Sequence, residues 1–451
     1  MIRSARLAMP RGGIRAVFLL AAAAVLSLAV SPARAVPIER VVSPGGIEIW
    51  LVRESTVPLV ALDFAFTGGA SQDPADKAGV GSMVSSLLDD GAGNLDSKSF
   101  HERLEGHAIE LKFQVNRDYF QGSLRTLSEH RDEAFDLLHL ALTAPRFDAE
   151  DVERARGQIL SSLRRATTSP NDIASKSWWA TAFPEHPYGR EMNGTLDSVP
   201  RIAIDDLKTY TKRVFARDNL KIAIVGDLEA AAAGALVDRV FGSLPAKADL
   251  HLIPAAIPQG LGRRIVVDLD VPQAVVTFGG TGIARQDPDF MAAYIVNYIL
   301  GGGTFSSRLY REVREKRGLV YGISDSLVWL KSASVMIGGT ATRSDSTGET
   351  LEVIESEMKR LAESGPTEEE LTKAKSYLKG SYALNLDTSS KIAGQLVQIQ
   401  LDNLGIDYMD RRSSLIDAVT LEDTKRLARR LLNGGMLVTV VGRPQGVTSR
   451  N

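Results

Sequence analysis

Hydrophobic and polar positions alternate in several short stretches of the chain, and this alternation is typical of β-strands. Each half of the chain opens with two such stretches and closes on a further β-rich run. The predicted strands are 47–52, 59–66 and 220–225 in the first half, and 265–267, 274–278 and 436–441 in the second.

Between these strands, apolar residues recur every three to four positions, which is the period of an amphipathic helix. The predicted helices are 135–142, 149–165, 349–361 and 368–382, and the segment 77–91 (KAGVGSMVSSLLDDG) also reads as a helix. Strands and helices do not alternate as regular βαβ units, so the predicted fold class is α+β.

Three motifs of the first half recur in the second half in the same order. Because ordered matches at nearly one offset indicate an internal repeat, we predict two homologous domains. Each should be a mostly antiparallel sheet packed with helices, and the two should be arranged as a clamshell. The paired positions are Phe66 and Phe278, Val152 and Leu371, and Gly226 and Gly442, at offsets of 212, 219 and 216.

The segment 243–262 carries three prolines and little periodicity, which favours an interdomain linker. The predicted domains are therefore 36–242 and 263–451. The first 35 residues combine basic positions, an apolar run over 17–30 and an Ala-Arg-Ala site that ends at Ala35. This pattern predicts a cleavable secretory signal, a periplasmic location and no stable membrane anchor after cleavage.

The amino-acid composition excludes several kinds of reactive and metal-binding site. The chain has no cysteine, which excludes disulfides, thiolate nucleophiles and cysteine zinc sites. A formal net charge of −2 argues against nucleic acid as a partner. None of the six histidines has another three or four positions away, and the nearest two, His101 and His107, are six apart. We therefore expect this chain to bind no metal of its own.

Two features carry a family resemblance, in addition to the repeat. A Gln-Asp-Pro turn leads into a helix that opens with glycine, and the segment 310–321 reads YREVREKRGLVY. On these features the chain resembles the pitrilysin/insulinase-type zinc peptidases, the inverzincins, which include the subunits of the mitochondrial processing peptidase. The resemblance covers essentially the whole chain after the predicted signal.

Active members of that family carry H-x-x-E-H on the helix that matches 77–91. The resemblance puts Ser82 and Ser86 at the two histidine positions and Ser85 at the glutamate. The third ligand of the family, a glutamate further along the chain, falls on Ser162, and an accompanying acidic position falls on Ala155. The resemblance therefore implies a vacated zinc site and a chain that is not active alone.

The serines themselves could be catalytic or structural. A serine hydrolase needs a base and an oxyanion hole, and the chain has no G-x-S-x-G elbow. We interpret Ser82, Ser85 and Ser86 as small residues that let neighbouring elements approach closely.

The resemblance also implies a role for Arg314 and Tyr321, which in the family bind the substrate carbonyl and stabilise the oxyanion. A guanidinium and a phenol both donate hydrogen bonds suited to that task. The alternative is a surface charge at Arg314 and a core strand residue at Tyr321. Gly318 predicts that a helix ends there and a strand begins at Leu319. The run Gly301, Gly302 and Gly303 is either a substrate-contacting loop or the end of a helix.

Together these inferences predict a noncatalytic subunit of a zinc-dependent peptidase heterodimer. The chain would supply Arg314 and Tyr321, and a homologous partner would supply zinc and act on peptides. The alternative is a stand-alone peptide-binding or scaffold protein with no peptidase role, since an extended peptide can add to a sheet edge without zinc.

Overall fold

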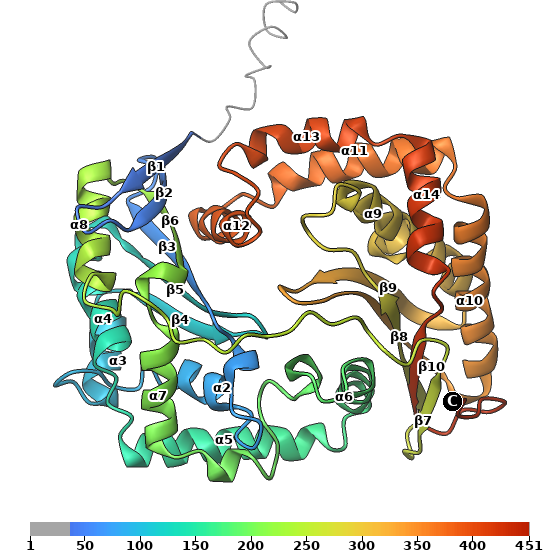
Figure 1. The fold of residues 1–451 in the computed structure, drawn as a ribbon, viewed down its shortest axis with the longest axis horizontal. Helices are drawn as coiled ribbons and strands as arrows, with labels where there is room; N and C mark the ends of the chain where they lie inside the picture. Colours follow the sequence, from blue (N-terminus) through green and yellow to red (C-terminus); the bar gives the residue numbers. More distant parts are fainter. Residues whose placement is uncertain (1–36, 451) are drawn as a thin grey trace, which may run out of the picture. The chain divides into compact units, whose positions relative to one another are not determined.

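Six strands form the sheet of the first half (Figure 1). The computed structural model describes residues 37–450, so the predicted signal segment 1–35 lies outside the described residues. The sheet order is β1-β2-β6-β3-β5-β4, and every pairing is antiparallel except that of β2 with β6. Its strands are β1 (Ile38–Val42), β2 (Glu48–Arg53), β3 (Leu59–Thr67), β4 (Glu110–Val115), β5 (Tyr119–Leu127) and β6 (Leu220–Gly226).

The sheet of the second half repeats this plan with five strands, in the order β7-β11-β8-β10-β9. The one parallel pair joins β7 to β11, at the place that β2 and β6 hold in the first sheet. The predicted repeat and the two-domain α+β fold are therefore confirmed. The strands are β7 (Arg264–Val267), β8 (Gln273–Thr281), β9 (Val320–Trp329), β10 (Ser334–Arg343) and β11 (Leu437–Val441).

Helices flank both sheets, and the four amphipathic helices predicted from periodicity are all present. The helices of the first half are α2 (Val80–Ser85), α3 (Ser97–Gly106), α4 (Arg131–Thr143), α5 (Ala149–Ala166), α6 (Pro170–Ala182), α7 (Ile204–Val214) and α8 (Ala230–Phe241). Those of the second half are α9 (Phe290–Asn297), α10 (Thr347–Ser364), α11 (Glu368–Leu384), α12 (Ser389–Leu401), α13 (Tyr408–Ala418) and α14 (Leu421–Leu432).

The two halves exchange one helix each. Helix α6 packs on β8 and β11 of the second sheet, and α12 packs on β3 and β6 of the first. The central strands are buried over runs of consecutive residues, so both faces of each sheet need a cover. At each contact one side chain also bonds the foreign strand: Trp178 Nε1 donates to Leu437 O at 3.1 Å, and Gln400 Nε2 donates to Ile222 O at 2.9 Å.

A buried polar junction ties the halves together a second time. The Tyr188 hydroxyl donates to one carboxyl oxygen of Asp118, and the Lys331 amide donates to the other at 2.8 Å. The Ser332 amide donates in turn to the Tyr188 hydroxyl at 3.0 Å. Burial raises the pKa of Asp118, and these hydrogen bonds act in the opposite direction.

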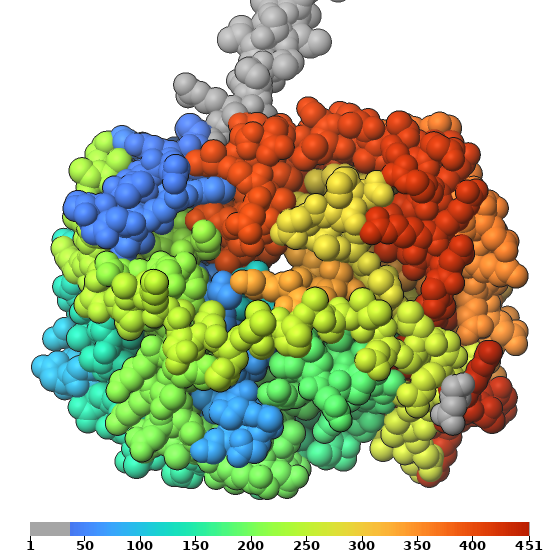
Figure 2. Space-filling model, viewed as in Figure 1, coloured from blue at the N-terminus to red at the C-terminus, as the bar shows by residue number. Residues whose placement is uncertain are grey.

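The segment between α8 and β7 has no regular secondary structure and is mostly exposed. Figure 2 shows it lying across the surface in view. It is tied down by backbone hydrogen bonds, such as those of Ala256 N to Ser332 O and Gln259 N to Ala182 O, both 2.8 Å. These features suit the predicted linker 243–262, although the domain limits 36–242 and 263–451 stay predictions. Within residues 37–450, no helix combines the length and the apolar character needed to cross a bilayer.

Replacing Trp178 by alanine should remove the anchor of α6 on the second sheet. Trp178 is fully buried and hydrogen-bonded, so Trp178→Ala should lower the free energy of unfolding by about 3–5 kcal/mol. Urea unfolding followed by circular dichroism measures this. Leu252→Ala, at a site 92% exposed, is the control and should change stability by less than about 0.5 kcal/mol. Equal stability of the two variants would contradict the anchoring role.

Candidate functional site

The Gln-Asp-Pro turn positions the helix that matches the zinc helix of the family. The Asp73 carboxylate accepts hydrogen bonds from the Gly79 amide at 2.8 Å and the Gly81 amide at 3.0 Å. Gly79 has φ of 102°, a left-handed conformation that glycine adopts without steric cost. Burial raises the pKa of Asp73 to about 7, while the two amides favour the ionised form. The turn therefore holds α2 in place without a metal.

Helix α2 is shorter than the predicted helix 77–91. It covers Val80–Ser85, and from Leu87 onward the backbone bonds narrow to tight turns, such as Asp90 N to Leu87 O. Ser85 Oγ donates to Ser82 O at 2.8 Å, and Ser86 Oγ donates to Met83 O at 2.9 Å. Because these two hydroxyls bond their own turn of backbone, the structural interpretation suits Ser85 and Ser86.

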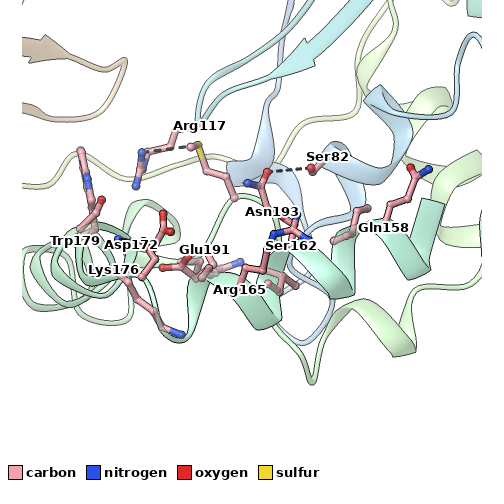
Figure 3. Close-up of a pocket in the computed structure, with 17 residues that line it drawn as sticks. Ser82, Arg117, Gln158, Ser162, Arg165, Asp172, Lys176, Trp179, Glu191 and Asn193 are labelled. Atoms are coloured by element: carbon pink, nitrogen blue, oxygen red, sulfur yellow. Dashed lines mark hydrogen bonds between the residues drawn. The ribbon is translucent and has the colours of Figure 1, made fainter. Parts of the chain in front are cut away.

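Ser82 differs, because it faces a cavity. Its hydroxyl donates to Asn193 Oδ1 at 3.0 Å, and Ser162 of α5 lines the same cavity of about 720 Å³ (Figure 3). Two of the four predicted zinc-motif positions are thus brought together from segments far apart in sequence, whereas Ser85 and Ser86 do not line the cavity. Ala155 is buried in the core. The other lining residues are Arg117, Gln158, Ile159, Leu163, Arg165, Ala166, Ser169, Asp172, Ser175, Lys176, Trp179, Arg190, Glu191, Met192 and Asn193.

The donor set of this cavity does not fit zinc. Zinc in proteins is held by histidine nitrogens, thiolates and carboxylates, and the family positions here carry serine hydroxyls. No group of three such ligands occurs in the described part of the chain. The cationic residues that line the cavity are Arg117, Arg165, Lys176 and Arg190, and the carboxylates are Asp172 and Glu191. This excess of positive charge disfavours the binding of a metal cation.

Arg314 and Tyr321 lie side by side. Arg314 lies near the end of a π-helical turn (Tyr310–Glu315). Gly318, with φ of 64°, leads into β9 at Val320, one residue later than predicted. Arg314 Nε donates to the Tyr321 carbonyl at 3.1 Å, and its guanidinium lies 4.9 Å from the ring centre of Tyr310. Tyr321 is 87% exposed, so the alternative of a core strand residue is wrong. Neither residue lines the cavity.

Of the two alternatives for Gly301–Gly303, the structure shows the end of a helix, and a contact of this segment with substrate stays a prediction. Gly301 and Gly302 belong to a π-helical turn that continues α9, and the Gly303 amide closes it by donating to Tyr298 O at 2.8 Å. Gly301 is buried, and a Cβ there would lie 2.6 Å from Asp325 Oδ1. The glycine is needed because the helix end packs directly on β9.

Comparison with known proteins gives the family. Residues 49–196 match the profile described as Insulinase (Peptidase family M16), and residues 201–378 match the profile described as Peptidase M16 inactive domain. The chain belongs to peptidase family M16. The predicted resemblance is therefore confirmed.

Individual M16 relatives agree with this assignment. The chain is 27% identical to a non-peptidase homolog of Helicobacter pylori, over 74% of this chain and 77% of the relative. It is 26% identical to an uncharacterized zinc protease of Streptomyces coelicolor, over 90% and 89% of the two chains. The crystal structure of a peptidase M16 inactive domain from Pseudomonas fluorescens superposes with a TM-score of 0.85 at 28% identity, covering 92% of this chain and 99% of that one.

Membership of the family bears on the activity of this chain. The chain is an inactive M16 peptidase homologue. The assignment of Ser82, Ser85, Ser86 and Ser162 to the positions of the family's zinc motif stays a prediction. The sequence analysis did not predict that cationic side chains would line the cavity beside Ser82 and Ser162. One local signal was available: Arg165 follows Ser162 by one helical turn and therefore shares its face of α5. Arg117 and Arg190 come from segments distant in sequence, and no local pattern indicated that they would line the same cavity.

Asp325 should make stability depend on pH. Both of its carboxyl oxygens are buried without a hydrogen-bond partner, and burial raises its pKa to about 8, opposed by the Asn297 amide. Because the folded pKa exceeds the ordinary value of 3.8, the folded state binds the proton more tightly, and stability falls as pH rises from about 4 through 8. Asp325→Asn should therefore gain stability relative to the natural chain on going from pH 5 to pH 9, by at least about 1.4 kcal/mol.

Urea unfolding at the two pH values measures this difference. Asp227→Asn, at an exposed site, is the control and should show no such gain. The interpretation of Asp325 would be lost if its variant differed from the natural chain by the same amount at both pH values.

Proposed function

We propose that this chain is the noncatalytic subunit of a periplasmic zinc-dependent peptidase heterodimer. Its partner would be a homologous chain that carries zinc, and the substrates would be peptides. Membership of family M16 and the vacated zinc positions support this proposal. The predicted secretory signal over 1–35 supports the periplasmic location. The observation that carries the proposal is the arrangement of Arg314 and Tyr321.

Arg314 and Tyr321 form a pair of hydrogen-bond donors that remain available to a ligand. The bond from Arg314 Nε to the Tyr321 backbone fixes the arginine beside the tyrosine and leaves the two terminal nitrogens of the guanidinium free to donate. Among the described residues, no carboxylate forms an ion pair with Arg314. Tyr321 presents its hydroxyl at the surface.

Such a pair can stabilise negative charge that develops on a substrate carbonyl. A guanidinium and a phenol held in advance need no reorganisation when the oxyanion forms, which is the main source of the stabilisation. Zinc in the partner would polarise the carbonyl and supply the attacking water. This chain would then contribute binding and transition-state stabilisation, and the partner would contribute the metal chemistry.

Arg314→Ala should lower the peptidase activity of the heterodimer without dissociating its two subunits. Loss of one oxyanion donor should lower kcat about 10²–10³-fold, equivalent to ~2.7–4 kcal/mol. The measurement uses this chain co-purified with the zinc-bearing M16 homologue of the same genome, assayed on a quenched fluorescent peptide. Tyr321→Phe, which removes only the hydroxyl, should also lower kcat. Arg201→Ala, which removes an exposed arginine elsewhere, is the control and should leave kcat unchanged.

Two results would refute the heterodimer. One is a partner that cleaves peptides equally fast with and without this chain. The other is full activity of the complex with Arg314→Ala in place, which would favour the alternative of a stand-alone peptide-binding or scaffold protein. In that case complex formation and peptide affinity would not depend on Arg314.

A further inference from the structure

The cavity at the vacated zinc position holds an unusual excess of unpaired positive charge. Arg117, Arg165, Lys176 and Arg190 line it, and within residues 37–450 none of them lies within ion-pair distance of a carboxylate. Most other arginines of the described chain are paired, as Arg430 is with Asp287 at 2.7 Å. Positive charge that is left unpaired around a cleft favours an anionic ligand.

Arg117 is the best-defined of the four. Its guanidinium lies 3.7 Å from the ring centre of Trp179, and its Nε donates to the Tyr188 carbonyl at 3.0 Å. Nη1 has only the Met192 sulfur, at 3.7 Å, and Nη2 has no hydrogen-bond partner among the described residues (Figure 3). Burial lowers the pKa of Arg117 to about 10, so the group stays charged at neutral pH. The guanidinium of Arg117 is thus held in one orientation, and its Nη1 and Nη2 groups can donate hydrogen bonds to a ligand.

The support behind Arg117 is itself buried. Trp179 is 8% exposed and stacks on Phe183 at 5.5 Å between ring centres, and Tyr188 is fully buried. An arginine stacked on an aromatic ring keeps its planar donors in one orientation, which suits a carboxylate in bidentate contact. The arrangement differs in this respect from a mobile surface arginine.

The other walls favour a peptide over a small inorganic anion. A volume of about 720 Å³ lies in the range of pockets that enclose organic ligands. Ile159 and Leu163 give an apolar strip along α5, whereas Ser162 and Asn193 offer polar contacts. The two carboxylates, Asp172 and Glu191, can accept from ligand N–H groups. Burial raises the pKa of Glu191, and Lys176 and Arg117 oppose that shift.

We propose that this cavity binds the carboxylate of a peptide at the position where active relatives hold zinc, with Arg117 and Arg165 as the anion-binding residues. The carboxylate could belong to the C-terminus of the peptide or to an acidic side chain, and both present the same planar group. The proposal goes beyond the heterodimer, because the chain alone, without a partner or metal, should bind such a peptide.

The first test compares peptides that differ only in their carboxylates. The purified chain is titrated with tetra-alanine as a free acid, with its C-amide, and with an amidated peptide that carries one aspartate. Binding is followed by calorimetry and by intrinsic tryptophan fluorescence. We expect at least one carboxylate-bearing peptide to bind about tenfold tighter than the neutral amide, and the two carboxylate peptides distinguish the terminus from the side chain. Binding should weaken with added salt.

The second test uses neighbouring arginines of α5. Arg164 and Arg165 are both exposed, but only Arg165 lines the cavity. Arg165→Gln should weaken binding about fivefold or more, and Arg164→Gln, the matched control, should not. Arg117→Lys keeps the charge but loses the planar fork, so it should also weaken binding.

Three outcomes would overturn the proposal. They are equal affinity for the acid and amide peptides, equal effects of Arg165→Gln and Arg164→Gln, and binding of inorganic phosphate with no binding of any peptide. Because all three are measured on the isolated chain, they are separate from the failure of the heterodimer, which is judged by the activity of the complex.

Discussion

The exchange of α6 and α12 between the two halves is the constraint on which the rest of the structure depends. The central strands are buried over runs of consecutive residues, and each sheet is covered in part by one helix from the other half. Adjacent residues of α6 show the consequence. Trp178 fixes the helix on the second sheet, and Trp179 supports Arg117 at the cavity of the first half. The α6 wall of the cavity is therefore held in place by the second sheet.

Helix α2 is supported by the turn that precedes it. The Asp73 carboxylate caps the helix through backbone amides, so the position of α2 depends on hydrogen bonds rather than on a metal. Ser82 of this helix has a small side chain, and the cavity that it faces is lined by four cationic side chains. The wall of the cavity beside Ser82 and Ser162 is therefore predominantly cationic.

The two candidate sites belong to different halves and suit different tasks. The cavity around Arg117 would hold a carboxylate of a peptide, whereas Arg314 and Tyr321 lie on the surface and would act on a carbonyl. β9 links the second site to the core, since it carries Tyr321 at the surface and the buried, unpaired Asp325 four residues later.

The sequence by itself determined the repeat, the central strands, the main amphipathic helices and the vacancy of the zinc motif, because each of these is recorded in local periodicity or in residue identity at fixed spacing. It also placed the helix end at Gly318, since few other residues adopt a left-handed turn. The tertiary structure alone decided the exchanged helices, the exposure of Tyr321, and the meeting of Arg117, Ser162 and Arg190. Those features depend on contacts between distant segments, and local side-chain patterns do not record which distant residue will lie across a cavity.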